Sequence, residues 1–350
     1  MYEIRLAHEA DRKALVQFIN QHWKINHIFV TCKKLLDWQH LDQARKTYNF
    51  VIGIEMKTQM IHGILGFIPL TQFDPEIPLK QLCWMAIWKV QASARGHKLG
   101  RRLLFYLEDT IKPDILSTVG ASEMTLSIYQ ARGYETGQLS HYFILNPYKS
   151  TFHLATTKNY SPPCAKAHTI NADKKIDQIF ENDLTNNTTE CFLAQKNLPR
   201  KSPGYLVNRY FQHPIYHYQV YRIQDGMDTT GIIVIRICSH KGSLALRIVD
   251  FIGSSEALRG LFGQWTSLLK NTDAEYIDFY NTGIDQDNLL SSGFVLREEG
   301  DGIVIPNYFE PFLKKNVEIN YMIKSPVGKT YRIVKGDSDQ DRPNLMTGLP

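Results

Sequence analysis

The sequence predicts an α/β (α+β) protein of two domains, each a mixed, mostly antiparallel central sheet flanked by helices. The chain has 350 residues, 43% of them hydrophobic, which suits two ordinary domains with cores of their own. Apolar, β-branched runs typical of strands alternate with segments whose apolar residues recur at helical spacing. The order of these elements repeats in the second half of the chain, where Gly293-Phe294 matches Gly133-Tyr134.

The first domain is expected at residues 1–147. Its strands are apolar and β-branched, and they are expected at residues 2–6, 49–56, 61–69, 82–90, 115–119 and 141–145. Its helices bury one apolar face each, and they are expected at residues 11–23, 33–41, 100–111 and 122–132. Pro113 ends the third helix because it cannot continue the hydrogen-bond ladder, and Gly133 suits the position after the fourth.

A change in composition separates the two domains. Residues 148–169 include Ser161-Pro162-Pro163-Cys164 and show little periodicity, so they are expected to be a linker. The second domain is expected at residues 170–325, with strands at residues 216–223, 231–238, 244–252 and 276–280 and helices from residue 254 or 255 and at residues 285–292. Residues 326–350 are expected to form a polar C-terminal tail.

Composition excludes several classes of protein. The net charge of +5 is weak and scattered, which argues against a nucleic-acid partner. The five cysteines are far apart and include no C-x-x-C, which favours reduced thiols in the cytoplasm. The first residues resemble a strand more than a signal peptide, and no apolar run approaches the roughly 20 residues that span a bilayer. No zinc spacing occurs, so no metal site is expected.

One stretch carries most of the functional signal. Residues 90–104 combine the end of an apolar strand, a turn rich in glycine and basic residues, and an amphipathic helix. Such a turn presents backbone N–H groups at the positive end of a helix, where a pyrophosphate can bind. The spacing favours coenzyme A over a nucleotide. The residues expected to bind this cofactor are Trp88, Val90, Ala92, Arg95, Gly96, His97, Lys98, Leu99, Gly100 and Arg101.

The order of elements and two motifs resemble the GNAT acetyltransferase superfamily over the first 147 residues. That family ends its fourth strand in V-x-P-x-x-R/Q-G-x-G-x-G/A, which Val90, Arg95, Gly96 and Gly100 fit. Ala92 replaces the usual proline, and Lys98 replaces the middle glycine. Residues 129–134 match the family's Tyr-x-x-x-Gly-Phe. The resemblance implies acetyl-CoA, or another acyl-CoA, as the acyl donor and direct attack by an amine on the thioester.

The resemblance also implies roles for particular residues. The backbone of residues 88–92 would bind the pantetheine arm, and Tyr129 would protonate the leaving thiolate. A phenol suits this task, because its pKa of about 10 keeps it protonated at neutral pH. Lys98 leaves two interpretations open. The lysine adds a cation beside the pyrophosphate, or the turn has lost the glycine it needs and binds nothing.

The general base and the acceptor site are less well defined by the sequence. Strand 82–90 lacks the glutamate that many GNAT enzymes use, so His27 is the first choice, because histidine titrates near neutrality. His40, Asp37 and Asp42 are second choices, and removal of the proton through water would need no dedicated residue. Arg200 and Arg209 lie in a segment that interleaves basic and aromatic residues. That segment either grips a sugar-nucleotide diphosphate or is an amphipathic helix packed on the core.

The second domain keeps the order of elements and lacks the phosphate motif. Asp250 and Glu256 flank the corresponding turn, where their charge would repel a pyrophosphate. The domain therefore resembles a GNAT domain without a cofactor site, shaping an acceptor pocket or a subunit interface, with a homodimer as one outcome. Residues 335–344 fail as an EF-hand. We expect a solvated tail there, and an ordered acidic loop contacting the acceptor is the alternative.

These features predict an acyl-CoA-dependent N-acyltransferase acting on a small-molecule amine. A looser resemblance to acyltransferases of bacterial surface-polysaccharide synthesis implies an amino-sugar acceptor, linked to a nucleotide. Two alternatives stay open. One is a transferase that uses aminoacyl-tRNA on a cell-wall precursor, since such enzymes also have paired GNAT-like domains. The other is a non-catalytic protein that binds acyl-CoA or a sugar nucleotide.

Overall fold

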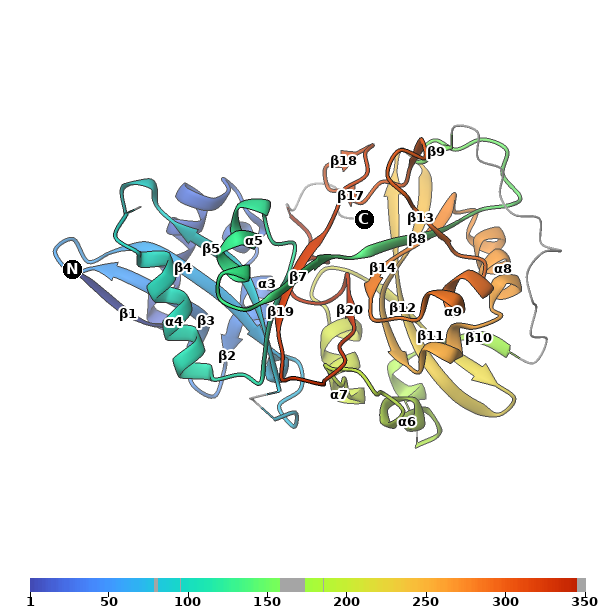
Figure 1. The fold of residues 1–350 in the computed structure, drawn as a ribbon, viewed down its shortest axis with the longest axis horizontal. Coiled ribbons are helices and arrows are strands. Elements are labelled where there is room, and N and C mark those ends of the chain that lie inside the picture. Colours follow the sequence, from blue (N-terminus) through green and yellow to red (C-terminus); the bar gives the residue numbers. More distant parts are fainter. Residues whose placement is uncertain (79–80, 95, 158–173, 185, 345–350) are drawn as a thin grey trace.

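Two large sheets, each flanked by helices, make up the protein (Figure 1). The computed structural model describes residues 1–78, 81–94, 96–157, 174–184 and 186–344. Both sheets have eight strands and are mainly antiparallel, with one parallel pair between neighbouring long strands in each. The predicted fold class is confirmed.

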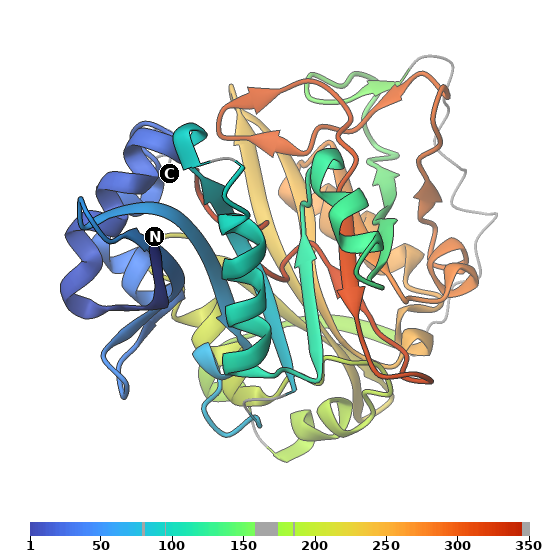
Figure 2. The same cartoon turned by 60° about the vertical axis from the view of Figure 1, so that its left-hand side comes forward.

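The first sheet has the strand order β1-β3-β4-β5-β6-β19-β7, with β2 beside β3. Its strands are β1 (Tyr2–His8), β2 (Leu41–Asp42), β3 (Thr47–Glu55), β4 (Met60–Pro69), β5 (Leu82–Val90), β6 (Ile115–Val119), β7 (Glu135–Gln138) and β19 (Asn320–Lys324). One face packs on α1 (Arg12–Phe18), a π-helical turn (Ile19–Trp23), α2 (Ile28–Thr31) and α3 (Lys33–His40). The other face packs on α4 (Leu99–Ile111) and α5 (Glu123–Gln130), which lie side by side over it in Figure 2.

The second sheet has the order β10-β11-β12-β13-β14-β8-β15, with β20 beside β14. Its strands are β8 (Ser140–Leu145), β10 (Lys174–Ile179), β11 (Tyr218–Asp225), β12 (Asp228–His240), β13 (Ser243–Gly253), β14 (Tyr276–Thr282), β15 (Val295–Leu296) and β20 (Ile333–Val334). Its helices are α6 (Asn186–Leu193), α7 (Pro203–Leu206), a π-helical turn (Val207–Phe211), α8 (Phe262–Thr272) and α9 (Gln286–Ser291). Two short antiparallel pairs lie outside these sheets. β9 (Thr156–Thr157) pairs with the distant β16 (Ile303–Val304), and β17 (Tyr308–Phe309) forms a hairpin with β18 (Phe312–Leu313).

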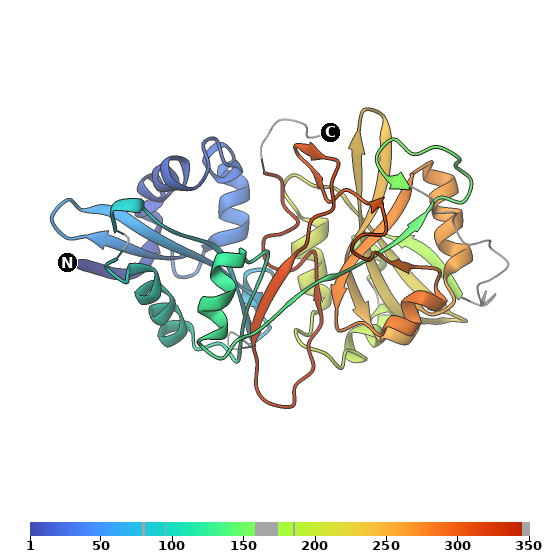
Figure 3. The ribbon, with the colours of Figure 1, turned by 45° about the horizontal axis from the view of Figure 1, so that its top comes forward.

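The two sheets exchange a strand. β8 follows β7 in sequence but pairs with β14 and β15 of the second sheet. In return, β19 inserts between β6 and β7 of the first sheet. Figure 3 shows green β8 crossing into the second lobe while red β19 lies in the first. The strand predicted at residues 141–145 exists, but it belongs to the other sheet, so the boundary at residue 147 does not separate two independent sheets.

A shared apolar core joins the two halves. Trp84 and Leu82 of β5 belong to the same buried cluster as Leu206, Val234 and Val249 of the second half. Apolar burial contributes about 25 cal/mol per Å² removed from water, so a common core ties the stability of each sheet to the other. Together with the strand exchange, this cluster fixes the second half against the splayed ends of β5 and β6, where the candidate site lies.

The segment predicted as a solvated tail is largely buried. Asp337 and Asp341 are 1% and 0% exposed, and both are ion-paired. Ile333 and Val334 form β20, which pairs with β14. The expectation of solvated residues here is wrong, because partners far away in the sequence neutralise the buried carboxylates.

Candidate functional site

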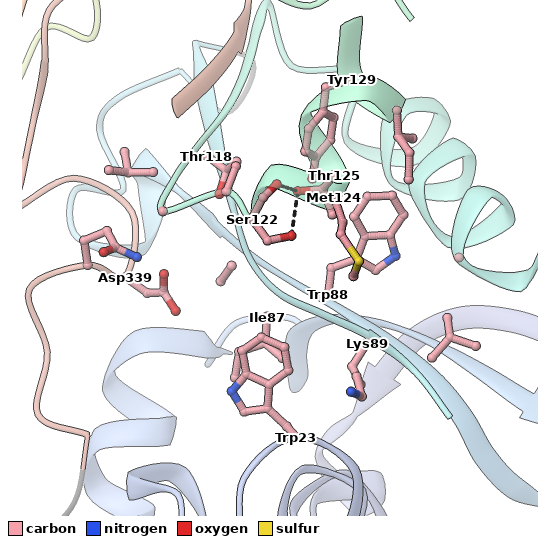
Figure 4. A pocket seen from close by; sticks show the side chains of 18 of the residues that line it. Trp23, Ile87, Trp88, Lys89, Thr118, Ser122, Met124, Thr125, Tyr129 and Asp339 are labelled. Atoms are coloured by element: carbon pink, nitrogen blue, oxygen red, sulfur yellow. Dashed lines mark hydrogen bonds between the residues drawn. The ribbon is translucent and has the colours of Figure 1, made fainter. Parts of the chain in front are cut away.

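The parallel strands β5 and β6 diverge and open a cavity. They are in register from Leu82–Ile115 to Trp84–Ser117, and beyond this point the Thr118 hydroxyl donates to the Met85 carbonyl at 2.7 Å. The divergence leaves a cavity of about 540 Å³ (Figure 4). It is lined by Trp23, Ala86, Ile87, Trp88, Lys89, Val90, Gly100, Thr118, Val119, Gly120, Ala121, Ser122, Met124, Thr125, Ile128, Tyr129, Asp339, Gln340 and Arg342.

A second cavity of about 710 Å³ adjoins the first between α4 and α5. Trp88, Gly100 and Ile128 line both cavities, so the two form one trough across the end of β5. A Cβ at Gly100 would have its nearest neighbours in Trp88 and Val90 at 3.4 Å. A larger side chain there would project into the trough.

The basic turn lies beside this trough. Gly96 has φ +92°, and Lys98, the N-cap of α4, has φ +54° and ψ 20°. Lys98 therefore takes the left-handed conformation that the family's glycine favours, at a cost of roughly 1–2 kcal/mol. The first intrahelical bond runs from Arg102 N to Lys98 O at 3.1 Å, so the N–H groups of residues 99–101 precede the ladder and can bind an anion.

The other predicted cofactor residues differ in their surroundings. Val90 and Trp88 line the cavity from β5, while Ala92 and His97 are exposed on the turn. The ring of His97 lies 6.2 Å from that of Tyr2. Arg95 lies outside the described residues.

A cation that the sequence analysis did not select lies at the far end of the trough. Arg101 and Arg132 both line the second cavity, and both stack on Phe105, with guanidinium carbons 4.9 and 4.3 Å from the ring centre. Arg132 also forms an ion pair with Glu108. The sequence signal that could have identified Arg132 is its position directly before the glycine of the Tyr-x-x-x-Gly motif.

Tyr129 reaches the cavity from α5 and is 3% exposed. Burial raises its pKa above the usual range, so the phenol is protonated at neutral pH. Its ring packs 5.8 Å from Trp88 and 5.6 Å from Tyr134. No described residue hydrogen-bonds its hydroxyl, which leaves the O–H able to donate to a molecule in the cavity.

The two histidines considered as bases do not line the cavity. His27 is 1% exposed and caps α2 by accepting a bond from Phe29 N at 3.2 Å. Burial, with help from the charge of Arg342, lowers the pKa of His27 to about 2. Burial also lowers the pKa of His40 to about 3. The expectation that His27 titrates near neutrality is therefore wrong, since desolvation opposes its charged form.

The remaining predicted acceptor residues have structural partners. Asp37 accepts a hydrogen bond from Tyr48 at 2.6 Å and pairs with Lys33. Arg209 is 2% exposed and donates to the Gly336 carbonyl at 3.1 Å. Arg200 is bonded through its backbone N to Gln81 at 3.1 Å.

The basic and aromatic segment around Arg209 packs against the protein interior. Tyr205 and Tyr210 are buried in the shared core, as the packing interpretation of this segment predicted. None of Arg200, Arg209, Asp37 or His40 is among the residues that line the trough.

Residues from the tail close the opposite wall of the cavity. Asp339, Gln340 and Arg342 line it opposite the α4–α5 side. Gly120 allows this approach, because a Cβ there would lie 2.0 Å from the Gln340 amide. No local motif marks these residues, and the sequence analysis considered an acceptor-contacting loop at residues 335–344 only as its alternative, without naming any of the three as a site residue.

The corresponding cleft of the second sheet is filled by the chain itself. β13 and β14 are in register from Leu246–Ile277 to Ile248–Phe279. Beyond that, β20 pairs with β14, and Gly336 N donates to the Val249 carbonyl at 2.7 Å. A Cβ at Gly336 would lie 2.5 Å from that carbonyl, so only glycine fits.

The turn of the second sheet differs from the prediction. Asp250 is fully buried and bonded to Lys201 at 2.7 Å, so it does not present charge to a ligand. Arg332 donates to the Gly253 carbonyl and to Ser255, which occupies the turn with a cation from the tail. A 3₁₀ turn (Ser255–Leu258) begins where the helix was predicted, with Ser254 as its N-cap, but the α-helix itself begins only at Phe262, after Gly260 at φ +77°. Occupation by the chain, and not charge repulsion, closes this cleft.

No family model matches the sequence, and no curated protein matches it. Solved structures do match. A GCN5-related N-acetyltransferase from Anabaena variabilis has a TM-score of 0.58 at 14% identity, covering 93% of this chain and 72% of its own.

The chain has the GCN5-related N-acetyltransferase fold. A second such protein, from Kribbella flavida, has a TM-score of 0.55 at 12% identity, covering 92% of this chain and 70% of its own. A probable N-acyltransferase from Enterococcus faecalis has a TM-score of 0.55 at 10% identity, covering 93% of this chain and 72% of its own. At such identities the likeness extends to the fold alone.

Two further findings concern metal binding and membrane-spanning helices. No cluster of three or more histidine, cysteine or acidic side chains among the described residues could hold a metal ion. Of the helices in the described ranges, none has the length and apolar character needed to cross a membrane.

Proposed function

We propose that this protein is an acyl-CoA-dependent N-acyltransferase that passes an acetyl or other acyl group to an amine by direct attack on the thioester. One observation carries the proposal. The divergence of β5 and β6 opens into a trough that runs past the start of α4 and ends between Arg101 and Arg132. A long molecule with a thioester at one end and phosphates at the other fits this sequence of surfaces.

The residues present suit coenzyme A. The free N–H groups of residues 99–101 and the positive end of α4 favour a pyrophosphate, and Lys98 adds a cation next to them. Gly100 leaves room for the chain of the cofactor between β5 and α4. Arg101 and Arg132 offer forked donors to a further phosphate. Lys98 either adds a cation beside the pyrophosphate or leaves the turn unable to bind. Its left-handed conformation supports the first interpretation, because the lysine keeps the backbone shape expected of the glycine that it replaces.

Tyr129 supplies the proton for the leaving thiolate. It is buried, protonated and without a bonded partner among the described residues, and it faces the cavity where β5 and β6 separate. As the C–S bond breaks, the O–H can donate to the sulfur. General acid catalysis of this kind contributes typically 10²–10⁴-fold to the rate.

The finer predictions about the acceptor are carried forward as proposals. An amino sugar, linked to a nucleotide, remains the proposed acceptor on the sequence resemblance. The first cavity is lined by Lys89 and Arg342, whose positive charges are compatible with an anionic group on the acceptor. A cytoplasmic location and a homodimer are likewise proposed from the sequence.

Calorimetry with acetyl-CoA tests the proposal directly. Wild-type protein is expected to bind, and Gly100→Trp is expected to abolish binding, because the indole fills the trough. Gly100→Ala is the matched control. Its Cβ meets nothing closer than 3.4 Å, so binding is expected to persist. No binding by the wild type, or equal binding by Gly100→Trp, would overturn the proposal.

Thiol release then separates the alternatives. An acyltransferase releases free coenzyme A when given acetyl-CoA and an amine from a panel of amino sugars, free and nucleotide-linked. A protein that binds acetyl-CoA and releases no thiol with any amine is a binding protein. Transfer from aminoacyl-tRNA without any use of acetyl-CoA would favour the alternative of an aminoacyl-tRNA-dependent transferase that acts on a cell-wall precursor.

A further inference from the structure

We infer that Asp339, carried by the tail, is the catalytic residue that binds the acceptor's ammonium group and takes its proton. The inference rests on the proposed function and deepens it, because it assigns the base that the first half of the chain lacks. It also means that the second half contributes a reacting group to the site of the first.

The cavity offers few charged groups. Among the described residues that line it, the charged side chains are Asp339, Arg342 and Lys89, so Asp339 is the one carboxylate. In Figure 4, Asp339 enters from the tail, while Tyr129 enters from α5. An acceptor amine placed between them would have a proton acceptor on one side and the thioester, with its acid, on the other.

The tail holds Asp339 in a fixed position. We call residues 337–344 the strap. On one side of Asp339, Asp337 pairs with Lys201 at 2.9 Å, and Ser338 donates to the Met85 carbonyl at 3.0 Å. On the other side, Asp341 pairs with Arg236 at 2.9 Å.

The far end of the strap is attached to the first domain. The Asn344 carbonyl accepts a hydrogen bond from Ile28 N of α2 at 3.1 Å. Asp341 also accepts a bond from the Tyr218 hydroxyl at 2.8 Å. A strap anchored at both ends keeps its central side chains within the narrow range of positions that proton transfer needs.

The bonding of the Asp339 carboxylate leaves one oxygen available. Arg342 donates to Oδ2 through Nε and Nη2, both at 3.3 Å. Oδ1 has no hydrogen-bond partner among the described residues, so it can accept a proton from a bound ammonium. Arg342 on the strap pairs with Asp339, and Tyr308 on β17 is close enough that its pKa is raised by burial and, in part, by the charge of Asp339. Lys89 on β5 and Tyr129 on α5 are the other titratable groups among the described residues that line the same cavity.

Asp339 and Tyr129 carry the two protons that the acceptor nitrogen loses during transfer. The ammonium gives one proton to Asp339 Oδ1, which later passes it to water. The free nitrogen lone pair attacks the thioester carbon, the C–N bond forms and the C–S bond breaks. Tyr129 gives its proton to the thiolate, and the second proton lost by nitrogen restores the phenol. The products are the amide, the free thiol and one proton released to solvent.

Two nucleophiles of different basicity test this role. At neutral pH, glucosamine is mostly protonated and hydroxylamine mostly is not. Asp339→Asn keeps the shape and the contact with Arg342, and it should lower kcat for acetyl transfer to glucosamine by about 10²-fold or more. Transfer to hydroxylamine should fall by less than about threefold, since that amine needs no base. Acetyl-CoA affinity should not change.

Matched variants keep the test decisive. Asp109→Asn makes the same chemical change on an exposed face of α4 and should leave both rates unchanged. Asp339→Ala should regain glucosamine transfer when formate is added, because formate replaces the lost carboxylate.

Failure of the Asp339 role and failure of the proposed function give different results. Equal losses with both nucleophiles, or no loss, would overturn the role of Asp339 while leaving the proposed function intact. Wild-type protein that binds no acetyl-CoA, or that binds it and releases no thiol with any amine of the panel, would instead overturn the proposed function, and this inference with it.

Discussion

Removing the ammonium group of Lys201 is expected to detach the tail and destabilise the whole protein. Lys201 Nζ lies 2.7 Å from Asp250 and 2.9 Å from Asp337, and all three side chains are buried. Lys201→Met retains the apolar stem and leaves two carboxylates without their cation. Breaking a buried ion pair from one side costs about 3–5 kcal/mol, so we expect a loss in that range.

The pH dependence of this loss has a defined sign. Burial raises the pKa of Asp337, and the charge of Lys201 opposes that rise. Without Lys201 the folded-state pKa moves further above its unfolded value. A group raised in this way stabilises the fold at low pH and ceases to do so as pH rises through the folded pKa. The deficit of Lys201→Met relative to wild type should therefore narrow as pH is lowered from 7.

Urea unfolding of both proteins at several pH values measures these effects. Lys196→Met is the control, because Lys196 is exposed nearby and its loss should stay within about 0.5 kcal/mol. The double variant Lys201→Met with Asp250→Asn should recover part of the loss. A cost below about 1 kcal/mol, or a deficit that widens at low pH, would refute the reasoning. Because the ion pair anchors the strap, transfer should also fall more than acetyl-CoA affinity does.

Two further predictions concern single residues of the first half. Tyr129→Phe should lower turnover by about 10²-fold or more with an unchanged Kd for acetyl-CoA, and unchanged turnover would exclude Tyr129 as the acid. His27→Asn keeps a cap for α2 while removing a group whose pKa is lowered to about 2. A depressed histidine pKa stabilises the fold above its unfolded value near 6.5 and ceases to do so as pH falls. The destabilisation caused by His27→Asn should therefore be about 2 kcal/mol smaller at pH 5 than at pH 7 in urea unfolding, and an equal loss at both would contradict the assignment.

Local patterns predicted most elements but not their pairing partners. The predicted strand at residues 141–145 is apolar from Tyr142 to Leu145, so this run indicates a buried strand but cannot say which sheet buries it. β8 pairs with β14 more than 100 residues away, as Tyr276 opposite Leu145 shows. Strand exchange depends on such distant contacts, which leave no trace in a short window of sequence.

The candidate site likewise has one part that a local motif predicts and another that depends on distant contacts. The turn around Gly96 and Lys98 could be proposed as a phosphate site from the sequence, because one continuous segment carries both the turn and the start of α4. The segment of Asp339 was only the alternative prediction for an acceptor contact, because acidic composition alone favours a solvated tail. The burial of its neighbours Asp337 and Asp341 depends on Lys201 and Arg236, and neither cation is near them in sequence. His27 was misjudged because a sequence does not show desolvation.

The path of the tail explains why the trough beside β5 has no counterpart among the described residues at the matching place in the second sheet. Arg332 and β20 fill the second cleft where a cofactor would otherwise lie, and Gly336 makes that fit possible. The same segment then continues as the strap into the first cavity. Filling one cleft therefore anchors the wall of the other, since the ion pair of Asp337 lies between the two. A free second cleft would remove the anchor on the Asp337 side of the strap and leave those at Asp341 and Asn344, so Asp339 would be held from one side only.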